Sequence, residues 1–169
     1  MSAAGTPMMQ RRTVSHLLLA SLVFAASGRS QAGPMAAEES ADEAALRRTR
    51  EGIGAAFRRG DVAGVLAYHH PEIRKALGYD HVVAGHAALA AELTASFAQA
   101  IVEFPEDIGE DLLIRGDTAF YQARFAARVT PKAGGEAAIY RGRTQMLLIR
   151  YPGSPSGWAM LREMIQAQS

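Results

Sequence analysis

The spacing of apolar residues changes near residue 100, and this change limits the folds that the chain can adopt. Before that point apolar side chains recur at the spacing of a helix face, as in Leu89, Leu93 and Phe97. From Ile101 onward they alternate with polar ones, which is typical of half-buried strands. Helices followed by strands favour an α+β fold in which the helices pack on one face of the sheet.

A capping box marks the start of the first helix. The Ser40 hydroxyl can accept a hydrogen bond from the amide of Glu43, and the Glu43 carboxylate can reach back to Ser40. Gly60 is expected to end this helix after Arg59, and Asp61 to cap a second, short helix.

The next segment has no clean period. Residues 68–80 are rich in polar and aromatic groups, and Pro71 disfavours the helical region for His70. We therefore expect an irregular, partly extended segment here, and a third helix after Gly85.

Beyond the third helix the alternation predicts five strands joined by turns rich in Gly, Pro and Asp. The predicted strands are Ile101–Phe104, Glu110–Ile114, Ala119–Val129, Ala138–Tyr151 and Trp158–Ile165. Long strands joined by short loops form an antiparallel meander. The predicted fold class is therefore α+β, with three N-terminal helices packed on a bent antiparallel sheet.

Residues 1–32 have the order of a secretory signal peptide. Basic residues precede an apolar run, the segment holds no acidic residue, and Ser30 and Ala32 are small residues of the kind that precede a cleavage site. The apolar run 17–26 is shorter than the ~20 residues that span a bilayer as a helix. We therefore expect a signal peptide over 1–32, a flexible lead-in over 33–40, and a periplasmic or secreted protein with no permanent membrane anchor.

Arg11 and Arg12 also fit a twin-arginine export signal, although the Phe-Leu that usually follows is absent.

Charge and cysteine content exclude several classes of function. Without residues 1–32 the chain has 15 basic and 17 acidic residues, a net charge of −2, so we expect no nucleic-acid partner. The 169 residues suit one domain, and the absence of cysteine excludes disulfides, Cys-ligated metals and thiol nucleophiles.

Five short motifs, in the same order, resemble the nuclear transport factor 2-like superfamily, on the side of its SnoaL-like and secreted bacterial members. They are FRRGDVAGVLAY at 57–68, AGHAAL at 84–89, RGDTA at 115–119, YRGRT at 140–144 and GWAML at 157–161. The resemblance covers nearly all of residues 41–169. It implies a cone-shaped α+β barrel, in which a strongly bent sheet wraps around a long helix and leaves a pocket at the wide end. The superfamily includes isomerases, cyclases, dehydratases and oligomerisation modules, so it implies no single function.

Acid–base chemistry of the isomerase type needs a carboxylate base and a tyrosine among apolar groups. In the isomerases of the superfamily that this chain resembles, the tyrosine lies on the first helix. The first helix expected here contains no tyrosine, and Glu72 lies beside Arg74 and Lys75, so that constellation is incomplete. The candidates for a general base are His70, which directly precedes Pro71, and Glu72.

No metal or cofactor is expected. His69 and His70 are adjacent, so in an extended segment their side chains point to opposite sides. They therefore do not form the one-face pair typical of a histidine metal site.

Polar side chains are expected to line the pocket. Lys75 is one of only two lysines, and the alternation of the last strand places Arg162 on one face with Met160 and Met164. The alternative for Arg162 is an ion pair with a glutamate such as Glu103. The expected ligand-binding residues are Tyr68, His70, Lys75, Tyr79, Arg124, Gln145 and Arg162.

The signal peptide predicts an exported protein. The apolar walls and the cationic and donor groups of the expected pocket predict that it binds a small, apolar, anionic or carbonyl-bearing molecule. One alternative is a SnoaL-like cyclase, isomerase or dehydratase that uses His70 or Glu72 as general base. A raised carboxylate pKa at Glu72, Asp80 or Glu163 would favour this enzyme. The other alternative is a dimerisation or interaction module, since the resemblance implies a homodimer through the outer face of the sheet.

Overall fold

The computed structural model describes residues 39–168 and confirms the α+β fold class. The expected signal peptide over 1–32 and most of the expected lead-in lie outside the described residues. Within the described part no helix is long and apolar enough to cross a membrane. The elements are α1 (Ala41–Arg59), α2 (Val62–Leu66), β1 (His69–Ala76), β2 (Val82–Ala84), α3 (Gly85–Gln99), β3 (Ala100–Arg115), β4 (Thr118–Pro131), β5 (Ala138–Arg150) and β6 (Trp158–Ala167).

The first two helices are capped by the residues that the sequence indicates. The Ser40 hydroxyl accepts from the Glu43 amide at 3.2 Å, and the Ser40 amide donates to the Glu43 carboxylate at 2.7 Å. Gly60 ends α1 with a φ of 62°, a left-handed conformation that costs glycine little. Asp61 accepts from the Gly64 amide at 2.8 Å and so caps α2.

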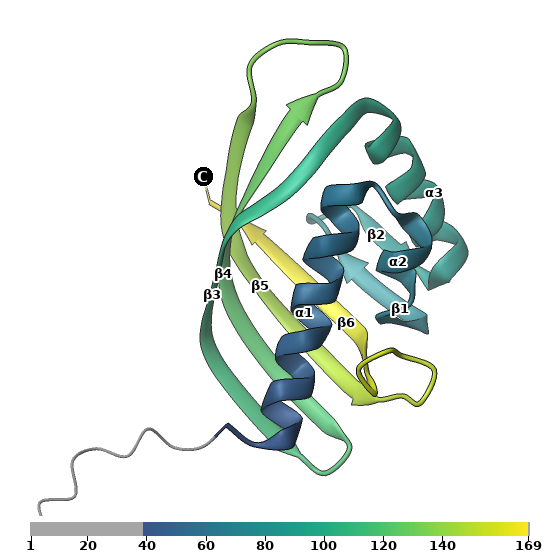
Figure 1. Cartoon of the computed structure of the whole chain (residues 1–169), viewed down its shortest axis with the longest axis vertical. Helices are drawn as coiled ribbons and strands as arrows, with labels where there is room; N and C mark the ends of the chain where they lie inside the picture. Colours follow the sequence, from purple (N-terminus) through teal and green to yellow (C-terminus); the bar gives the residue numbers. More distant parts are fainter. Residues whose placement is uncertain (1–38, 169) are drawn as a thin grey trace, which may run out of the picture. The chain divides into compact units, whose positions relative to one another are not determined.

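All six strands form one sheet, in the order β2-β1-β6-β5-β4-β3. The strands β3 to β6 form the predicted antiparallel meander, whereas β1 runs parallel to β6. The sheet is therefore mixed, and the expectation of a wholly antiparallel sheet is corrected at this one pair. Figure 1 shows the sheet bending around α1, with α1 and α3 on the same side of it.

The first strand lies where the sequence suggested an irregular segment. Residues 69–76 form β1, and its pairing with β6 shifts between His69 and Arg74. Pro71 falls within this irregularity, where a missing amide hydrogen does not interrupt a regular ladder. The proline that argued against regular structure is thus accommodated inside a strand.

A single strand, β3, replaces two that the sequence predicts. Its pairing with β4 shifts between Glu103 and Glu106, and again between Gly109 and Asp111. Such bulges bend a strand without ending it. The polar run between the two predicted strands is therefore a bend within β3.

The core contains side chains from the helices and from one face of the sheet. Trp158, at the start of β6, is fully buried. Phe57 and Leu66 are half-buried at its edge. Leu89, Leu93 and Phe97 of α3 and Leu148 of β5 are buried in it.

The two faces of the sheet differ in polarity. The face that packs against the helices is termed the inner face, and the opposite one the outer face. On β4, Tyr121 and Ala123 are buried on the inner face, whereas Arg124 is exposed on the outer face.

A bulge in β6 reverses the alternation of its side chains. Leu148 pairs with Met160 and Leu147 pairs with Arg162, so Leu161 is an extra residue on β6. Met160 therefore faces inward with Leu148, and Arg162 faces outward with Leu147. The prediction that Met160 and Arg162 share one face is wrong for this reason.

Candidate functional site

Four polar side chains gather on the inner face, and Lys75, Glu163, Thr144 and His69 are together termed the inner cluster. Lys75 on β1 pairs with Glu163 on β6, and the distance from Lys75 Nζ to Glu163 Oε2 is 2.6 Å. Their side chains are only 10% and 9% exposed. Thr144 on β5 donates its hydroxyl to Glu163 Oε1 at 2.8 Å, while the other carboxylate oxygen, Oε2, is the one that lies against Lys75 Nζ.

The pKa of Glu163 lies below its ordinary value. Burial raises the pKa of this carboxyl, but the positive charge of Lys75 and the hydrogen bonds from Lys75 and Thr144 outweigh burial. Glu163 is therefore ionised at neutral pH, with its charge compensated by Lys75. The raised carboxylate pKa that would favour an enzyme does not occur at this residue.

His69 supplies a neutral acceptor to the inner cluster. Its Nδ1 lies 2.8 Å from the carbonyl oxygen of Val65, which can only accept, so we assign the ring proton to Nδ1. The other nitrogen, Nε2, is buried and has no hydrogen-bond partner among residues 39–168. Burial, and then the charge of Lys75, lowers the pKa of His69 to about 3, so its ring is neutral at physiological pH.

Tyr121 lies on the same face, two strands away from Glu163. Met146 of β5 pairs with both of them and so places the three residues in one row across the strands. The Tyr121 hydroxyl is buried without a hydrogen-bond partner in the described part of the chain, and burial raises its pKa to about 12. It therefore keeps its proton and can donate. The Arg50 guanidinium of α1 lies 4.2 Å from the centre of the Tyr121 ring.

Aromatic side chains from helices and sheet make much of the interior apolar. Phe57 packs edge to face against Phe97, with ring centres 5.3 Å apart, and against Phe104, with ring centres 5.2 Å apart. Phe125 extends the group, 6.4 Å from Phe104. The interior is therefore apolar apart from the few polar groups of the inner cluster and Tyr121.

The predicted general bases do not face this interior. His70 and Glu72 alternate with buried Ile73 and Lys75 along β1, so they point to the other side of the strand. The His70 ring packs against Tyr151 at 4.9 Å, and Glu72 is exposed. The placement of His70 and Glu72 in an interior site is therefore corrected.

Lys75 is the predicted ligand-binding residue that belongs to the inner cluster. Tyr68 is half-buried, and its ring lies against Gly52 of α1, where it leaves no room for a larger residue. Tyr79 is fully exposed and contributes to no interior site.

The other three predicted ligand-binding residues lie on the outer face. Arg124 Nε is 2.7 Å from a carboxylate oxygen of Glu110, and Gln145 donates to the side chain of Gln122 at 3.0 Å. Arg162 faces outward because of the bulge in β6. The prediction that Arg124 and Arg162 point into the interior is wrong, because strand parity was assigned without knowing which face the helices cover.

Sequence reasoning gave His69, Thr144 and Tyr121 no role in the site. His69 could have been found from strand alternation, because His69, Ile73 and Lys75 share one face if residues 69–76 form a strand. Glu163 was considered only as a carboxylate with a raised pKa, and its pairing with Lys75 depends on the parallel contact of β1 with β6, which no local pattern shows.

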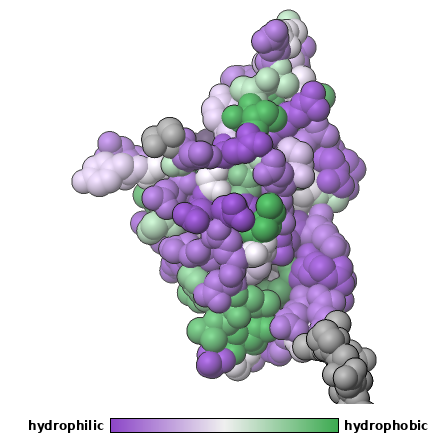
Figure 2. Space-filling view, turned by 90° about the vertical axis from the view of Figure 1, so that its left-hand side faces the viewer, coloured by the Kyte–Doolittle hydropathy of each residue, from purple (hydrophilic) through white to green (hydrophobic). Residues whose placement is uncertain are grey.

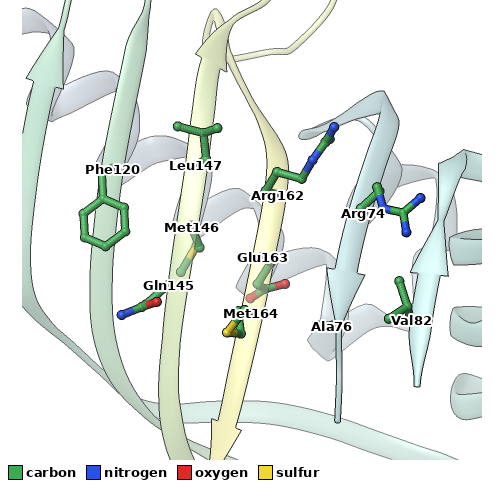
Figure 3. A pocket seen from close by; sticks show the side chains of 10 residues that line it. All are labelled: Arg74, Ala76, Val82, Phe120, Gln145, Met146, Leu147, Arg162, Glu163 and Met164. Carbon is green, nitrogen blue, oxygen red and sulfur yellow. The ribbon is translucent and has the colours of Figure 1, made fainter. Parts of the chain in front are cut away.

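A second feature is a hollow on the outer face, with a volume of about 360 Å³. It spans β4, β5, β6, β1 and β2, and Figure 3 shows Arg74 and Arg162 on its β1 side. It is termed the outer hollow. Among residues 39–168 no group of His, Asp and Glu is arranged to hold a metal ion.

No protein-family model matches the sequence, and none of the curated proteins matches it. Solved structures match over about three quarters of the chain. A conserved protein from Planctomyces limnophilus is 19% identical, with a TM-score of 0.67, 76% of this chain covered and 98% of that one. A ketosteroid isomerase-like protein from Erwinia carotovora atroseptica is 20% identical, with a TM-score of 0.61 and coverages of 75% and 95%. A nuclear transport factor 2-like superfamily protein from Salmonella enterica is 9% identical, with a TM-score of 0.62 and coverages of 77% and 94%.

Proposed function

We propose that this chain, which has the nuclear transport factor 2-like fold, binds a small, uncharged, carbonyl-bearing apolar molecule against its inner face. The observation that carries the proposal is the Tyr121 hydroxyl, a buried donor with no hydrogen-bond partner among residues 39–168. A buried polar group without a partner costs about 1–3 kcal/mol, so a ligand carbonyl that accepts from Tyr121 recovers a real penalty. The Nε2 atom of His69 offers an acceptor to a ligand hydroxyl in the same way.

The charge of the inner cluster favours a neutral ligand over an anion. Lys75 is the only lysine or arginine of the cluster, and Glu163 lies 2.6 Å from it. A carboxylate brought next to Lys75 would also meet the ionised Glu163 and be repelled. The sequence-based expectation of an anionic or carbonyl-bearing ligand therefore narrows to the carbonyl.

Catalysis is the second candidate. An isomerase needs a carboxylate base and a protonated hydroxyl near the ligand carbonyl, and Glu163 and Tyr121 occupy the same row of the inner face. The matched isomerase-like structure lends support to this candidate. We favour binding alone, because the ion pair with Lys75 lowers the pKa of Glu163 and makes it a weak base.

The test compares Tyr121→Phe with Tyr140→Phe, which removes the same hydroxyl from an exposed tyrosine. Calorimetry with a panel of cyclic ketones, phenols, carboxylates and amines of equal size should select ketones or phenols. Tyr121→Phe should weaken that binding up to about tenfold, because one hydrogen bond is lost, and Tyr140→Phe should not. Equal binding by Tyr121→Phe, or a preference for amines, would overturn the proposal.

The same ligands also test catalysis. NMR in deuterated water follows the exchange of the proton on the carbon next to the ketone carbonyl for deuterium. Proton exchange that depends on Glu163 would show catalysis and overturn the proposal of binding alone. Ligand binding without proton exchange would support binding alone.

A further inference from the structure

Two arginines are neighbours on the outer face, outside the site described above; Figure 3 shows the Arg162 side chain reaching toward β1 and the Arg74 side chain pointing toward β2. Arg74 of β1 and Arg162 of β6 are paired residues on neighbouring parallel strands, which lie about 4.8 Å apart. Both are exposed. Like charges placed directly opposite each other on a sheet repel, so this pair is unfavourable unless an anion lies between them.

Neither arginine has a carboxylate partner among the described residues, although other arginines of this face do. Arg124 and Arg143 both pair with Glu110, and Arg141 pairs with Glu106. These three arginines of the outer face are therefore neutralised by glutamates, whereas the two arginines beside the outer hollow are not.

The Arg162 guanidinium is held in place without being neutralised. Its Nη1 donates to the backbone oxygen of Glu72 at 3.0 Å and to that of Leu161 at 2.7 Å. The Nε and Nη2 atoms of Arg162 make no hydrogen bond within residues 39–168. A carboxylate can accept from both, which is the paired geometry that arginine prefers.

The outer hollow beside these arginines is largely apolar. Ala76, Phe120 and Leu147 contribute outward-facing apolar side chains to it, and Figure 3 shows Leu147 and Phe120 on adjacent strands. Val82 and Met164 at its edge are 49% and 59% exposed. Its volume of about 360 Å³ is about twelve times the ~30 Å³ that a water molecule occupies in the liquid. A ligand of roughly ten non-hydrogen atoms fits that space.

We propose that the outer hollow binds a small free carboxylate with an apolar tail. The carboxylate lies between Arg74 and Arg162, and the tail covers Leu147 and Phe120. Glu163 of the inner cluster also lines the hollow, but Tyr121, which carries the proposed carbonyl site, does not, so the two proposals are tested separately. A carboxylate on a second copy of the chain is the competing occupant.

The test uses the full-length protein and three probes of equal chain length: octanoate, octan-1-ol and octylamine. Calorimetry should detect octanoate, and octan-1-ol and octylamine should bind at least about tenfold more weakly, because they lack the charge-assisted hydrogen bonds. Raising the salt concentration should weaken octanoate binding, since both arginines are exposed to solvent.

Matched variants assign the binding to these arginines. Arg74→Gln should weaken octanoate about tenfold or more, and Arg48→Gln, at an exposed arginine of α1, should not. Arg162→Gln is expected to do the same, but it also removes the hydrogen bond to the Glu72 carbonyl, which joins β6 to β1. Arg74→Gln is therefore decisive, because its side chain makes no hydrogen bond within the described residues, and unchanged thermal melting confirms that it folds.

Three results would overturn the proposal. The first is octanoate binding that survives in Arg74→Gln. The second is octanoate binding that is lost in Tyr121→Phe, which would place the ligand at the inner face. The third is a dimer in sedimentation that Leu147→Glu dissociates, with no octanoate bound, which would make the hollow an interface between copies. If the inner face binds no carbonyl ligand, the effect of Arg74→Gln on octanoate binding is unchanged. Failure of the proposed function and failure of the outer-hollow proposal therefore give different results.

Discussion

Lys75 and Glu163 depend on each other because neither charge has much contact with water. Removing one partner leaves the other charge buried and uncompensated, which costs about 3–5 kcal/mol of unfolding free energy. We expect Lys75→Met alone to be destabilised by that amount. The double variant Lys75→Met/Glu163→Leu should recover most of the loss, because an apolar pair needs no compensating charge. Urea denaturation measures both values, and a double variant no more stable than Lys75→Met would contradict the buried ion pair.

His69 makes stability depend on pH in a defined window. The unfolded chain takes up a proton on His69 below about pH 6.5, whereas the folded chain takes it up only near its lowered pKa of about 3. Stability therefore falls as the pH falls between these values, by about 1 kcal/mol from pH 6 to pH 5. Glu163 does not contribute between pH 6 and pH 5, because its stabilising effect is lost only as the pH falls below its ordinary value of 4.5.

The measurement compares His69→Asn with His81→Asn, which changes an exposed histidine. Asparagine at position 69 keeps a donor for the Val65 carbonyl but does not titrate. Urea denaturation at pH 6 and pH 5 should show the smaller pH effect in His69→Asn only. A His69→Asn variant that keeps the pH effect of the unmodified protein would rule out His69 as its source.

At this scale the sequence identified residue types better than their directions. Lys75 was recognised as a candidate because lysine is rare in this chain, and it is in the inner cluster. His70 was preferred to His69 because of Pro71, yet the alternation of β1 buries His69. Arg162 was expected to face inward, and one extra residue, Leu161, turns it outward. A direction that depends on a bulge has no signal in the local pattern.

The elements tolerate a methyl group very differently. A Cβ on Gly142 of β5 would lie 2.5 Å from the backbone oxygen of Gln166 and 3.1 Å from the Phe125 ring, whereas Gly54 of α1 has nothing within 4 Å. We expect Gly142→Ala to lose about 1–3 kcal/mol of unfolding free energy through overpacking. Gly54→Ala should gain about 0.4–1 kcal/mol, because alanine loses less conformational entropy in a helix.

Chemical denaturation of the two glycine variants tests both elements at once. A neutral Gly142→Ala would mean that β5 and β6 do not approach as closely as the structure shows. A destabilised Gly54→Ala would mean that this side of α1 is covered.

Elements held by local interactions were predictable, and those held by distant ones were not. The capping box of α1 and the glycine that ends it lie within the helix's own sequence, so both ends of α1 follow from local pattern. The strand β1 is stabilised by pairing with β6. Its residue Arg74 pairs with Arg162, which lies about ninety residues later in the sequence. Because β1 contains a proline and has mixed polarity, its local sequence did not predict a strand, and the residues that pair with it lie far along the chain. The bulges of β3 likewise made one strand look like two.

For the whole molecule, the outer face combines charges of both signs. Figure 2 shows this side largely hydrophilic, with an apolar patch towards its lower end. Leu113, Phe120 and Leu147 are successive partners across β3, β4 and β5 and form an apolar row on this face. Arg124, Arg141 and Arg143 of this face pair with glutamates, so the part of the face around them offers no continuous basic surface for nucleic acid.

Export is a further expectation for the whole chain. Residues 1–32 contain no acidic residue and carry the basic, apolar and small-residue order of a signal peptide. A cut after Ala32 would fall before Ser40, which caps α1, and so would leave every described element intact.

We expect the protein made in a Gram-negative host to be recovered from the periplasm or medium with Gly33 as its first residue. Ala32→Arg should leave uncleaved precursor, because the peptidase reads a small side chain there, whereas Ala37→Arg should be processed normally. N-terminal sequencing of each fraction measures this. Lysines in place of Arg11 and Arg12 should block export only if the twin-arginine route is used, since that route reads the arginine pair. An intact Met1 in cytoplasmic protein would refute export and restore the net charge of +1 to the working molecule.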